Sequence, residues 1–323
     1  MKKLDIALFS LSFLLLALLL SNSNPSKVFS TLLEVDALFI AASVATITII
    51  IAVKLTRWKI ILDSIGIKRP LKTLLGPYLA SLFLSNITPA RVGEPSRSYY
   101  LKKATGDSFS LSIATVVLER IMDLSVMALF SLVGIYFLSA FLPGEVSITI
   151  GVVISIIIIA LLLSSNKKIL SWFIIRVCAI LKKIPRIKNA PLINRLEKGM
   201  EHFLSNFHKG FVLATREKNI LIPLLMTAAA WVLEAGVVYF SFLSIGIHVP
   251  FYIALSVFSL SLLVGLMTFL PGNIGSFEAS AVILLMRSQN LGVAEAMAGI
   301  MIYRLCTLWF VLIVSGKFFL DQR

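Results

Sequence analysis

Residues 88–94 read Thr-Pro-Ala-Arg-Val-Gly-Glu, and residues 269–278 read Phe-Leu-Pro-Gly-Asn-Ile-Gly-Ser-Phe-Glu. Each stretch follows an apolar run and places a proline, then a glycine four residues later, and then an acid. These positions are Pro89, Gly93 and Glu94 in the first stretch, and Pro271, Gly275 and Glu278 in the second. Proline removes a backbone donor and glycine adopts conformations that other residues avoid, so both interrupt helices. The two stretches therefore predict related helix breaks inside apolar surroundings.

The sequence around these breaks is that of a membrane protein. Of its 323 residues, 58% are hydrophobic and 14% are charged, which does not describe a water-soluble globule. Apolar segments lie at about 4–20, 37–56, 74–88, 110–141, 146–165, 219–246, 251–270 and 293–317. Several reach the roughly 20 residues that cross about 30 Å of hydrocarbon, and none alternates as the strands of a β-barrel do. We expect an all-α, polytopic membrane helix bundle that forms a single membrane domain over residues 1–323.

Basic residues in the loops predict how the helices are oriented, because Lys and Arg accumulate on the cytoplasmic side of a membrane. The loop 57–72 begins with Arg57, and the amphipathic segment 166–218 carries twelve Lys or Arg and three Glu, so both are expected in the cytoplasm. We therefore expect the basic residues that give the net charge of +14 to face a membrane surface and not to bind nucleic acid. Every loop agrees with about six spans plus two re-entrant helical hairpins at 73–103 and 251–289. Both termini are then cytoplasmic, and the expected location is the cell (plasma) membrane.

In this topology the two hairpins enter from opposite faces, so the chain contains an inverted repeat. Its halves are about 37–141 and 219–317, and each consists of a span, a hairpin and a second span. Transporters often combine inverted repeats with broken helices near the middle of the membrane, because the backbone ends at a break bind polar groups. The alternative is that Pro and Gly merely end helices at loops.

Charged residues deep inside the apolar runs give a second line of argument. Glu119, Arg120 and Asp123 lie ten or more residues into their helix, and Glu234 and Arg304 lie as deep in later runs. Charges this deep line a protein interior or a water-filled cavity, and they pair with one another. One interpretation is an internal salt-bridge lock between helices, and the other is a binding site.

The second interpretation gives the arginines a ligand. Guanidinium groups bind phosphate oxygens in bidentate fashion, so arginines near two hairpin tips suit a lipid head group that carries phosphate. The candidate head-group ligands are Arg91, Arg97, Arg120 and Arg304. The supporting acids, which hold these arginines or a cationic head group, are Glu94, Glu119, Asp123, Glu234 and Glu278.

No pattern in the sequence indicates catalysis, a cofactor or a metal. The two cysteines, Cys178 and Cys306, have no spacing that suggests a metal site, and there is neither a phosphate-binding loop nor a dinucleotide fingerprint. We therefore expect a protein that is not an enzyme and that takes no cofactor.

Three motifs in the same order resemble a known family: residues 88–94 with Arg97, Glu119-Arg120 with Asp123, and residues 270–275 with Glu278. They are similar to the flippase-like membrane domain of lysylphosphatidylglycerol synthases. That family includes stand-alone bacterial and archaeal proteins, some once described as dolichol-phosphate glucose synthetases. The resemblance covers about residues 4–317 and implies a lipid-translocation role, in which an aminoacylated phosphatidylglycerol moves between leaflets.

The sequence departs from the full synthases in two ways. No aminoacyl-transferase domain follows Arg323, so we do not expect this chain to make a lysyl-lipid itself. Family members commonly have Gly-Gly-Leu-Gly followed by Arg-Glu where residues 272–278 read Gly-Asn-Ile-Gly-Ser-Phe-Glu. The expected lipid is therefore left as an anionic or aminoacylated phospholipid or a polyprenyl-phosphate lipid.

Two other functions stay open. The first is a membrane enzyme that acts on polyprenyl-phosphate sugars. The second is an accessory scaffold that presents segment 166–218 to a cytoplasmic synthase or glycosyltransferase.

Overall fold

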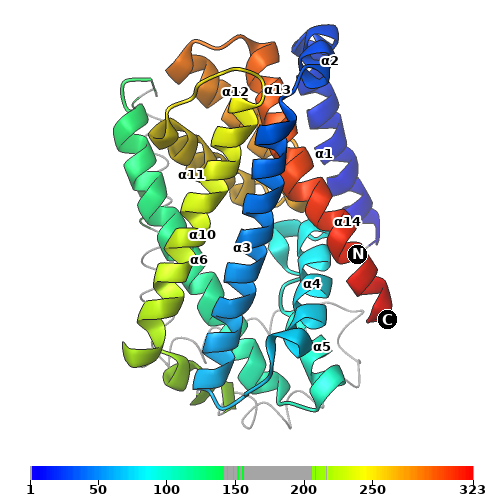
Figure 1. Cartoon of the computed structure of the whole chain (residues 1–323), viewed down its shortest axis with the longest axis vertical. Helices are drawn as coiled ribbons and strands as arrows, with labels where there is room; N and C mark the ends of the chain where they lie inside the picture. The colour runs from blue at the N-terminus through cyan, green and yellow to red at the C-terminus, as the bar shows by residue number, and fades with distance from the viewer. Residues whose placement is uncertain are drawn as a thin grey trace.

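The computed structural model describes residues 2–141, 206, 207, 209–215 and 217–322, together with single positions at 144, 148, 151, 152 and 155. Within these residues every regular element is a helix (Figure 1). In chain order the elements are α1 (Lys2–Asn22), α2 (Pro25–Leu33), α3 (Ala37–Ser64), α4 (Leu71–Ile87), η1 (Pro89–Arg91), α5 (Ser96–Thr105), α6 (Phe109–Leu138), α10 (Glu217–Leu243), α11 (Phe251–Met267), η2 (Pro271–Asn273), α12 (Ser276–Gln289), α13 (Val293–Arg304), η3 (Leu305–Trp309) and α14 (Phe310–Asp321). Most of the predicted span 146–165 and most of the predicted segment 166–218 lie outside the described residues.

Long apolar helices form the frame of the molecule. Among the described residues, four helices are long and apolar enough to cross a membrane: Ala37–Ser64, Phe109–Leu138, Ile220–Leu243 and Val293–Asp321. The last of these joins α13 to α14 through the π-helical turn η3. Figure 1 shows α3, α6 and α10 running along the length of the molecule. The expected all-α, multi-pass membrane helix bundle is confirmed.

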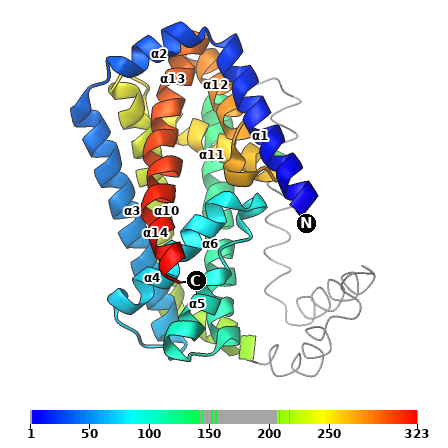
Figure 2. The ribbon, with the colours of Figure 1, turned by 90° about the vertical axis from the view of Figure 1, so that its right-hand side faces the viewer.

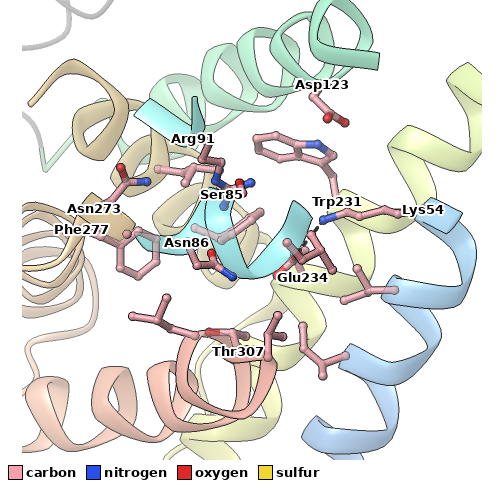
Figure 3. A pocket seen from close by; sticks show the side chains of 18 of the residues that line it. Lys54, Ser85, Asn86, Arg91, Asp123, Trp231, Glu234, Asn273, Phe277 and Thr307 are labelled. Carbon is pink, nitrogen blue, oxygen red and sulfur yellow. Dashed lines mark hydrogen bonds and ion pairs between the residues drawn. The ribbon is translucent and has the colours of Figure 1, made fainter. Parts of the chain in front are cut away.

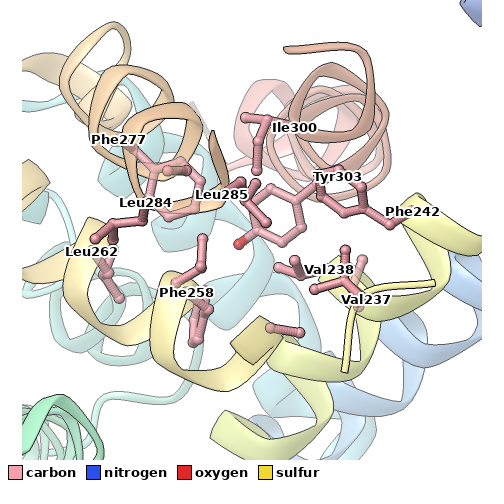
Figure 4. Packing of buried hydrophobic residues seen from close by; sticks show 14 of the residues in the cluster. Val237, Val238, Phe242, Phe258, Leu262, Phe277, Leu284, Leu285, Ile300 and Tyr303 are labelled. Carbon is pink, nitrogen blue, oxygen red and sulfur yellow. The ribbon is translucent and has the colours of Figure 1, made fainter. Parts of the chain in front are cut away.

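Small residues allow these helices to approach closely. Where α6 crosses α11, a Cβ on Gly134 would lie 3.2 Å from the Cα of Ser256. A Cβ on Gly299 of α13 would lie 2.4 Å from the ring of Phe242 on α10. Large side chains fill the remaining space, and Figure 4 shows Phe258, Phe277 and Tyr303 meeting between α11, α12 and α13. Because lipid is as apolar as the side chains, close packing of this kind holds membrane helices together.

Two helical hairpins lie between the long helices. The first hairpin is α4, η1 and α5, and the second is α11, η2 and α12. They approach from opposite ends of the molecule (Figure 2), and their tips η1 and η2 are in contact. A Cβ on Gly272 would lie 3.0 Å from the carbonyl oxygen of Asn86, so glycine at this position lets the two tips meet. The packing is also reciprocal, because α4 packs against α14 while α11 packs against α6.

One boundary differs from the prediction. α3 continues to Ser64, so residues 57–64 are helical rather than the start of a cytoplasmic loop. Arg57 is only 3% exposed, and Trp58 and Leu62 are fully buried. The helix continues because apolar residues keep helical spacing after Arg57, and because Arg57 finds partners inside the bundle.

Interactions between loops close both ends of the bundle. At one end, the guanidinium of Arg69 donates two hydrogen bonds of 2.9 Å to the carboxylate of Asp107. This pair joins the loop before α4 to the loop before α6. At the other end, the N–H of Asp36 donates to the carbonyl of Ser244 over 2.8 Å and joins the loops before α3 and after α10. These contacts join the four loops in two pairs, one at each end of the bundle.

Candidate functional site

Both breaks contain a short 3-10 turn. η1 begins at Pro89 and η2 begins at Pro271, and each is a 3-10 turn of three residues. The third residue of each turn, Arg91 or Asn273, has a left-handed φ of 57° or 55°. Asparagine tolerates this conformation, whereas arginine seldom adopts it, and such strain costs about 1–3 kcal/mol and is typical of functional sites. The sequence repeat therefore corresponds to two short turns that each end on a left-handed residue, Arg91 or Asn273, and after which the backbone differs, since Val92 is helical and Ile274 is extended.

The two break glycines are needed for different reasons. A Cβ on Gly93 would lie 2.4 Å from the carbonyl carbon of Leu84, so any side chain there collides with the backbone of α4. Gly275 has a φ of 89°, which L-residues avoid, and a Cβ on it would lie 2.8 Å from the Cβ of Leu15 on α1. Both glycine N–H groups are used: that of Gly93 donates to the hydroxyl of Thr88 over 2.8 Å. That of Gly275 donates to the carboxylate of Glu278 over 2.7 Å.

An acid after each break binds an arginine on the long helix that follows. Glu94 is paired through Oε1 with Nη2 of Arg120 on α6. Glu278 accepts a 2.6 Å hydrogen bond on Oε1 from Nε of Arg304 on α13, and Arg304 also donates to the carbonyl of Asn273 over 3.2 Å. The structure thus brings together two pairs of predicted site residues, one beside each break.

A third charged cluster lies inside the bundle between α3, α5, α6 and α10. Glu119, which is 1% exposed, accepts a hydrogen bond from Nε of Arg57 over 2.9 Å and is also paired with Arg97. Nη1 of Arg57 donates to Asp123 and to the hydroxyl of Thr227, both over 2.7 Å. This cluster connects α3, α5, α6 and α10, and it has the form of the predicted salt-bridge lock.

The Arg97 guanidinium is held inside that cluster. It lies 4.9 Å from the ring centroid of Trp58 and 5.8 Å from that of Tyr78, which are cation–π distances. The indole N–H of Trp58 in turn donates to the hydroxyl of Thr115 over 3.1 Å. Arg97 was a candidate head-group ligand, but the structure places it behind the wall of the cavity described next.

The hairpin tips and the long helices surround an open cavity with about 1160 Å³ of empty space, including its mouth. Its wall contains apolar side chains from both halves, among them Ile50, Met127, Trp231 and Phe258. Figure 3 shows the polar residues Arg91, Asn86 and Asn273 on one side, and the ion pair of Lys54 with Glu234 on the other. The polar lining residues are Lys54, Ser85, Asn86, Arg91, Arg120, Asp123, Glu234, Asn273, Arg304 and Thr307.

The predicted site residues divide into two layers around this cavity. Arg91, Arg120, Asp123, Glu234 and Arg304 line it. The second layer lies behind the wall: Glu94 and Glu278 pair with the lining residues Arg120 and Arg304, whereas Glu119 and Arg97 pair with each other. The breaks at Pro89, Gly93, Pro271 and Gly275 set the backbone that carries both layers.

Two charged residues of the site were missed by the sequence reasoning. Lys54 pairs with Glu234 through a 2.9 Å contact between α3 and α10, and Arg57 joins Glu119 to Asp123. Both stand near the end of an apolar run, where a basic residue looks like the start of a cytoplasmic loop. Trp58, directly after Arg57, continues the helical spacing of the apolar residues. This signal could have placed Lys54 and Arg57 inside the bundle.

The charges around the cavity leave one cation without a partner. Each of the five acids Glu94, Glu119, Asp123, Glu234 and Glu278 forms an ion pair. The bases in the same region are Lys54, Arg57, Arg91, Arg97, Arg120 and Arg304. Within the described residues the side chain of Arg91 forms neither an ion pair nor a hydrogen bond, whereas the other five bases are paired. A cavity with a net positive charge and apolar walls suits an anion attached to a hydrocarbon chain.

The fold and the cavity define a multi-pass helical membrane protein whose charged site lies between two broken helices. The chain belongs to the family of the lysylphosphatidylglycerol synthase transmembrane region, whose model matches residues 4–315. The resemblance inferred from the three motifs is therefore confirmed.

Relatives of the chain are membrane proteins of archaea and bacteria. A UPF0104 membrane protein of Methanothermobacter thermautotrophicus is 24% identical over 326 aligned residues, covering 96% of this chain and 93% of the relative. A UPF0104 membrane protein of Methanocaldococcus jannaschii is 31% identical over 75% of this chain and 95% of the relative. A phosphatidylglycerol lysyltransferase of Staphylococcus xylosus is 28% identical over 91 residues, which is 28% of this chain and 11% of that protein.

Proposed function

We propose that the protein moves a phosphate-bearing lipid between the leaflets of a membrane, with its head group in the central cavity. The observation that carries this proposal is a single charged cavity to which both hairpin tips contribute. Arg91, Arg120 and Arg304 contact the phosphate, and the apolar wall accepts the chain that follows it. The family description supports a lipid, because lysylphosphatidylglycerol is itself a phospholipid.

Alternating access follows from the proposed inverted repeat. The contacts between the halves support this repeat, since α4 meets α14 as α11 meets α6, and α3 meets α10. Two hairpins that approach from opposite ends would, in a membrane, re-enter from opposite faces. Tilting one half against the other then exposes the cavity to each face in turn.

The proposed orientation follows from where the basic residues lie. The end closed by Arg69 and Asp107 carries several lysines in its loops and helix ends, namely Lys68, Lys72, Lys102 and Lys103. The opposite end carries acids such as Glu34 and Asp36. We therefore assign the basic end and both termini to the cytoplasm, and the protein to the plasma membrane.

We propose transport rather than catalysis. Each of the carboxylates around the cavity is bound to an arginine or a lysine in an ion pair, so none of them is presented to a lipid without a partner. The relative from Staphylococcus xylosus is a lipid-modifying enzyme of which the matching region is a small part. This supports the further proposal that the chain acts beside a separate cytoplasmic synthase or glycosyltransferase.

The test is lipid movement in proteoliposomes that contain the full chain and a fluorescent phosphatidylglycerol. Dithionite quenches only the outer leaflet, so translocation appears as a second phase of quenching. We expect Arg304→Gln to slow that phase at least about tenfold, the effect of losing one charge-assisted contact. The matched control is Arg287→Gln, which changes an exposed arginine at the end of α12. Equal rates for wild type and for both Arg304→Gln and Arg120→Gln would contradict the proposal.

A further inference from the structure

The cavity carries one positive charge that nothing in the described protein neutralises. Its other bases are each held by an acid: Arg120 by Glu94, Arg304 by Glu278, and Lys54 by Glu234. Arg57 and Arg97 are held in the same way by Glu119 and Asp123. Arg91 remains, at the tip of the first hairpin and on the wall of the cavity.

The position of Arg91 is unfavourable without a ligand. Its charge repels that of Arg120, which also lines the cavity. Its backbone is held in the left-handed region, where an arginine is seldom found. An anion between the two guanidiniums would replace this repulsion by attraction to both. The structure thus keeps a cation in a costly place that faces the cavity.

Uncharged polar groups lie beside Arg91. The side-chain amides of Asn86 and Asn273 line the cavity, and within the described residues neither amide forms a hydrogen bond. Thr307 uses its hydroxyl hydrogen on the carbonyl of Tyr303 and keeps its oxygen as an acceptor. Amide and hydroxyl groups of this kind bind hydroxyls well, whereas an ammonium group would meet acids that are already paired.

We infer that the cavity selects a phosphodiester lipid with one negative charge and a hydroxyl-bearing, uncharged head, and that Arg91 determines this specificity. The inference rests on the proposed function only in taking the occupant to be a lipid. A single phosphodiester charge neutralises Arg91, and Asn86 and Asn273 bind the hydroxyls. An aminoacylated head group adds positive charge to a cavity that already has an excess, and a phosphate monoester brings more negative charge than Arg91 balances.

Two kinds of lipid share this chemistry. One is a phospholipid with a glycerol head group, and the other is a polyprenyl phosphate that carries a neutral sugar. Both are phosphodiesters with one negative charge and several hydroxyls. They differ in the hydrocarbon, which the apolar wall of the cavity contacts.

The test is competitive lipid binding to the purified full chain, measured by native mass spectrometry. The probes are phosphatidylglycerol, a polyprenyl phosphate sugar, unmodified polyprenyl phosphate, lysylphosphatidylglycerol and phosphatidylcholine. We expect one or both of the first two to bind best, and their order identifies the source. Arg91→Gln should reduce that binding at least about tenfold relative to phosphatidylcholine, whereas Arg91→Lys should largely retain it.

A second variant tests the charge balance by raising the positive charge of the cavity instead of lowering it. Glu234→Gln removes one acid from the cavity, so the excess rises to two positive charges, and preference should move towards unmodified polyprenyl phosphate. Arg69→Gln, in the loop pair with Asp107, should bind all five lipids as wild type does. This control lowers the overall charge by one, as Arg91→Gln does, so it shows whether the effect of Arg91→Gln reflects the cavity or only the overall charge of the protein.

The outcomes separate this inference from the proposed function. Equal or tighter binding of lysylphosphatidylglycerol or of unmodified polyprenyl phosphate to wild type would overturn the inference, as would unchanged preference in Arg91→Gln. The expected preference without movement between leaflets would support the inference and contradict transport. Movement of all five lipids at one rate, without a binding preference, would support transport and contradict the inference.

Discussion

At the scale of single residues, Glu119 shows how the interior of the bundle is held together. Its two carboxylate oxygens bind arginines from different helices, Arg57 of α3 and Arg97 of α5. All three side chains are almost fully buried. In such surroundings a charge is stable only while its partner remains, so each member depends on the others.

We predict that Glu119→Gln destabilises the fold by about 3–5 kcal/mol, because it leaves two buried arginines undercompensated. Thermal unfolding of the purified protein in detergent measures this. Asp107→Asn is the matched control, since it removes an acid from a pair whose arginine is 39% exposed, and it should cost less than about 1 kcal/mol. Equal losses of unfolding free energy in Glu119→Gln and Asp107→Asn would contradict the prediction that the buried arginines depend on Glu119.

The sequence could identify charged residues of the site where two copies of a motif could be compared. The pairs of Arg120 with Glu94 and of Arg304 with Glu278 join positions that both halves share. Arg57 could not be found in this way, because its partner Glu119 lies 62 residues away and no repeat marks the pair. The left-handed turn at Arg91 was equally hidden, because arginine itself gives no signal for that conformation.

At the scale of elements, the tip of each hairpin depends on close backbone contacts. Gly93 touches the backbone of α4 near Leu84, and Gly272 touches the carbonyl of Asn86 in the other half. The positions of these helices were predictable, since α4 to α5 spans 71–105 where 73–103 was expected, and α11 to α12 spans 251–289 as expected. Pro and Gly mark where a helix stops, but they do not show that the two tips meet.

We predict that Gly93→Ala destabilises the protein by about 1–3 kcal/mol, because the added methyl overlaps the α4 backbone and moves the tip that carries Arg91. Gly236→Ala is the control. Gly236 lies inside α10 with open space where a Cβ would stand, so alanine should be neutral or stabilising by up to about 1 kcal/mol. Thermal unfolding and the proteoliposome assay measure both variants, and a neutral Gly93→Ala would contradict the contact.

At the scale of the whole molecule, the ion pair of Lys54 with Glu234 joins α3 to α10 on one wall of the cavity. It lies where α3 of the first half packs against α10 of the second. Both side chains are partly buried, at 21% and 15% exposure, so like charges there would repel strongly. The pair therefore contributes both to assembly of the halves and to the charge balance of the cavity.

We predict that Lys54→Glu and Glu234→Lys each destabilise the protein by about 2–3 kcal/mol, and that the double exchange restores most of this loss. The coupling free energy from the four unfolding measurements should be about 1–3 kcal/mol. The double variant also keeps the charge of the cavity, so its lipid preference should match wild type. Additive losses would show that the two side chains do not interact.

The matching turns at Arg91 and Asn273 have a consequence for direction. They belong to hairpins that approach from opposite ends of the molecule and meet at one cavity, so in the proposed transport a lipid that leaves towards either leaflet passes the hairpin tips. A carrier that works in this way without coupling to an energy source shortens the time to equilibrium and leaves the equilibrium distribution of the lipid unchanged. Any lasting asymmetry of the membrane would then reflect where the lipid is made and where it is consumed, with this protein determining how fast the two places communicate.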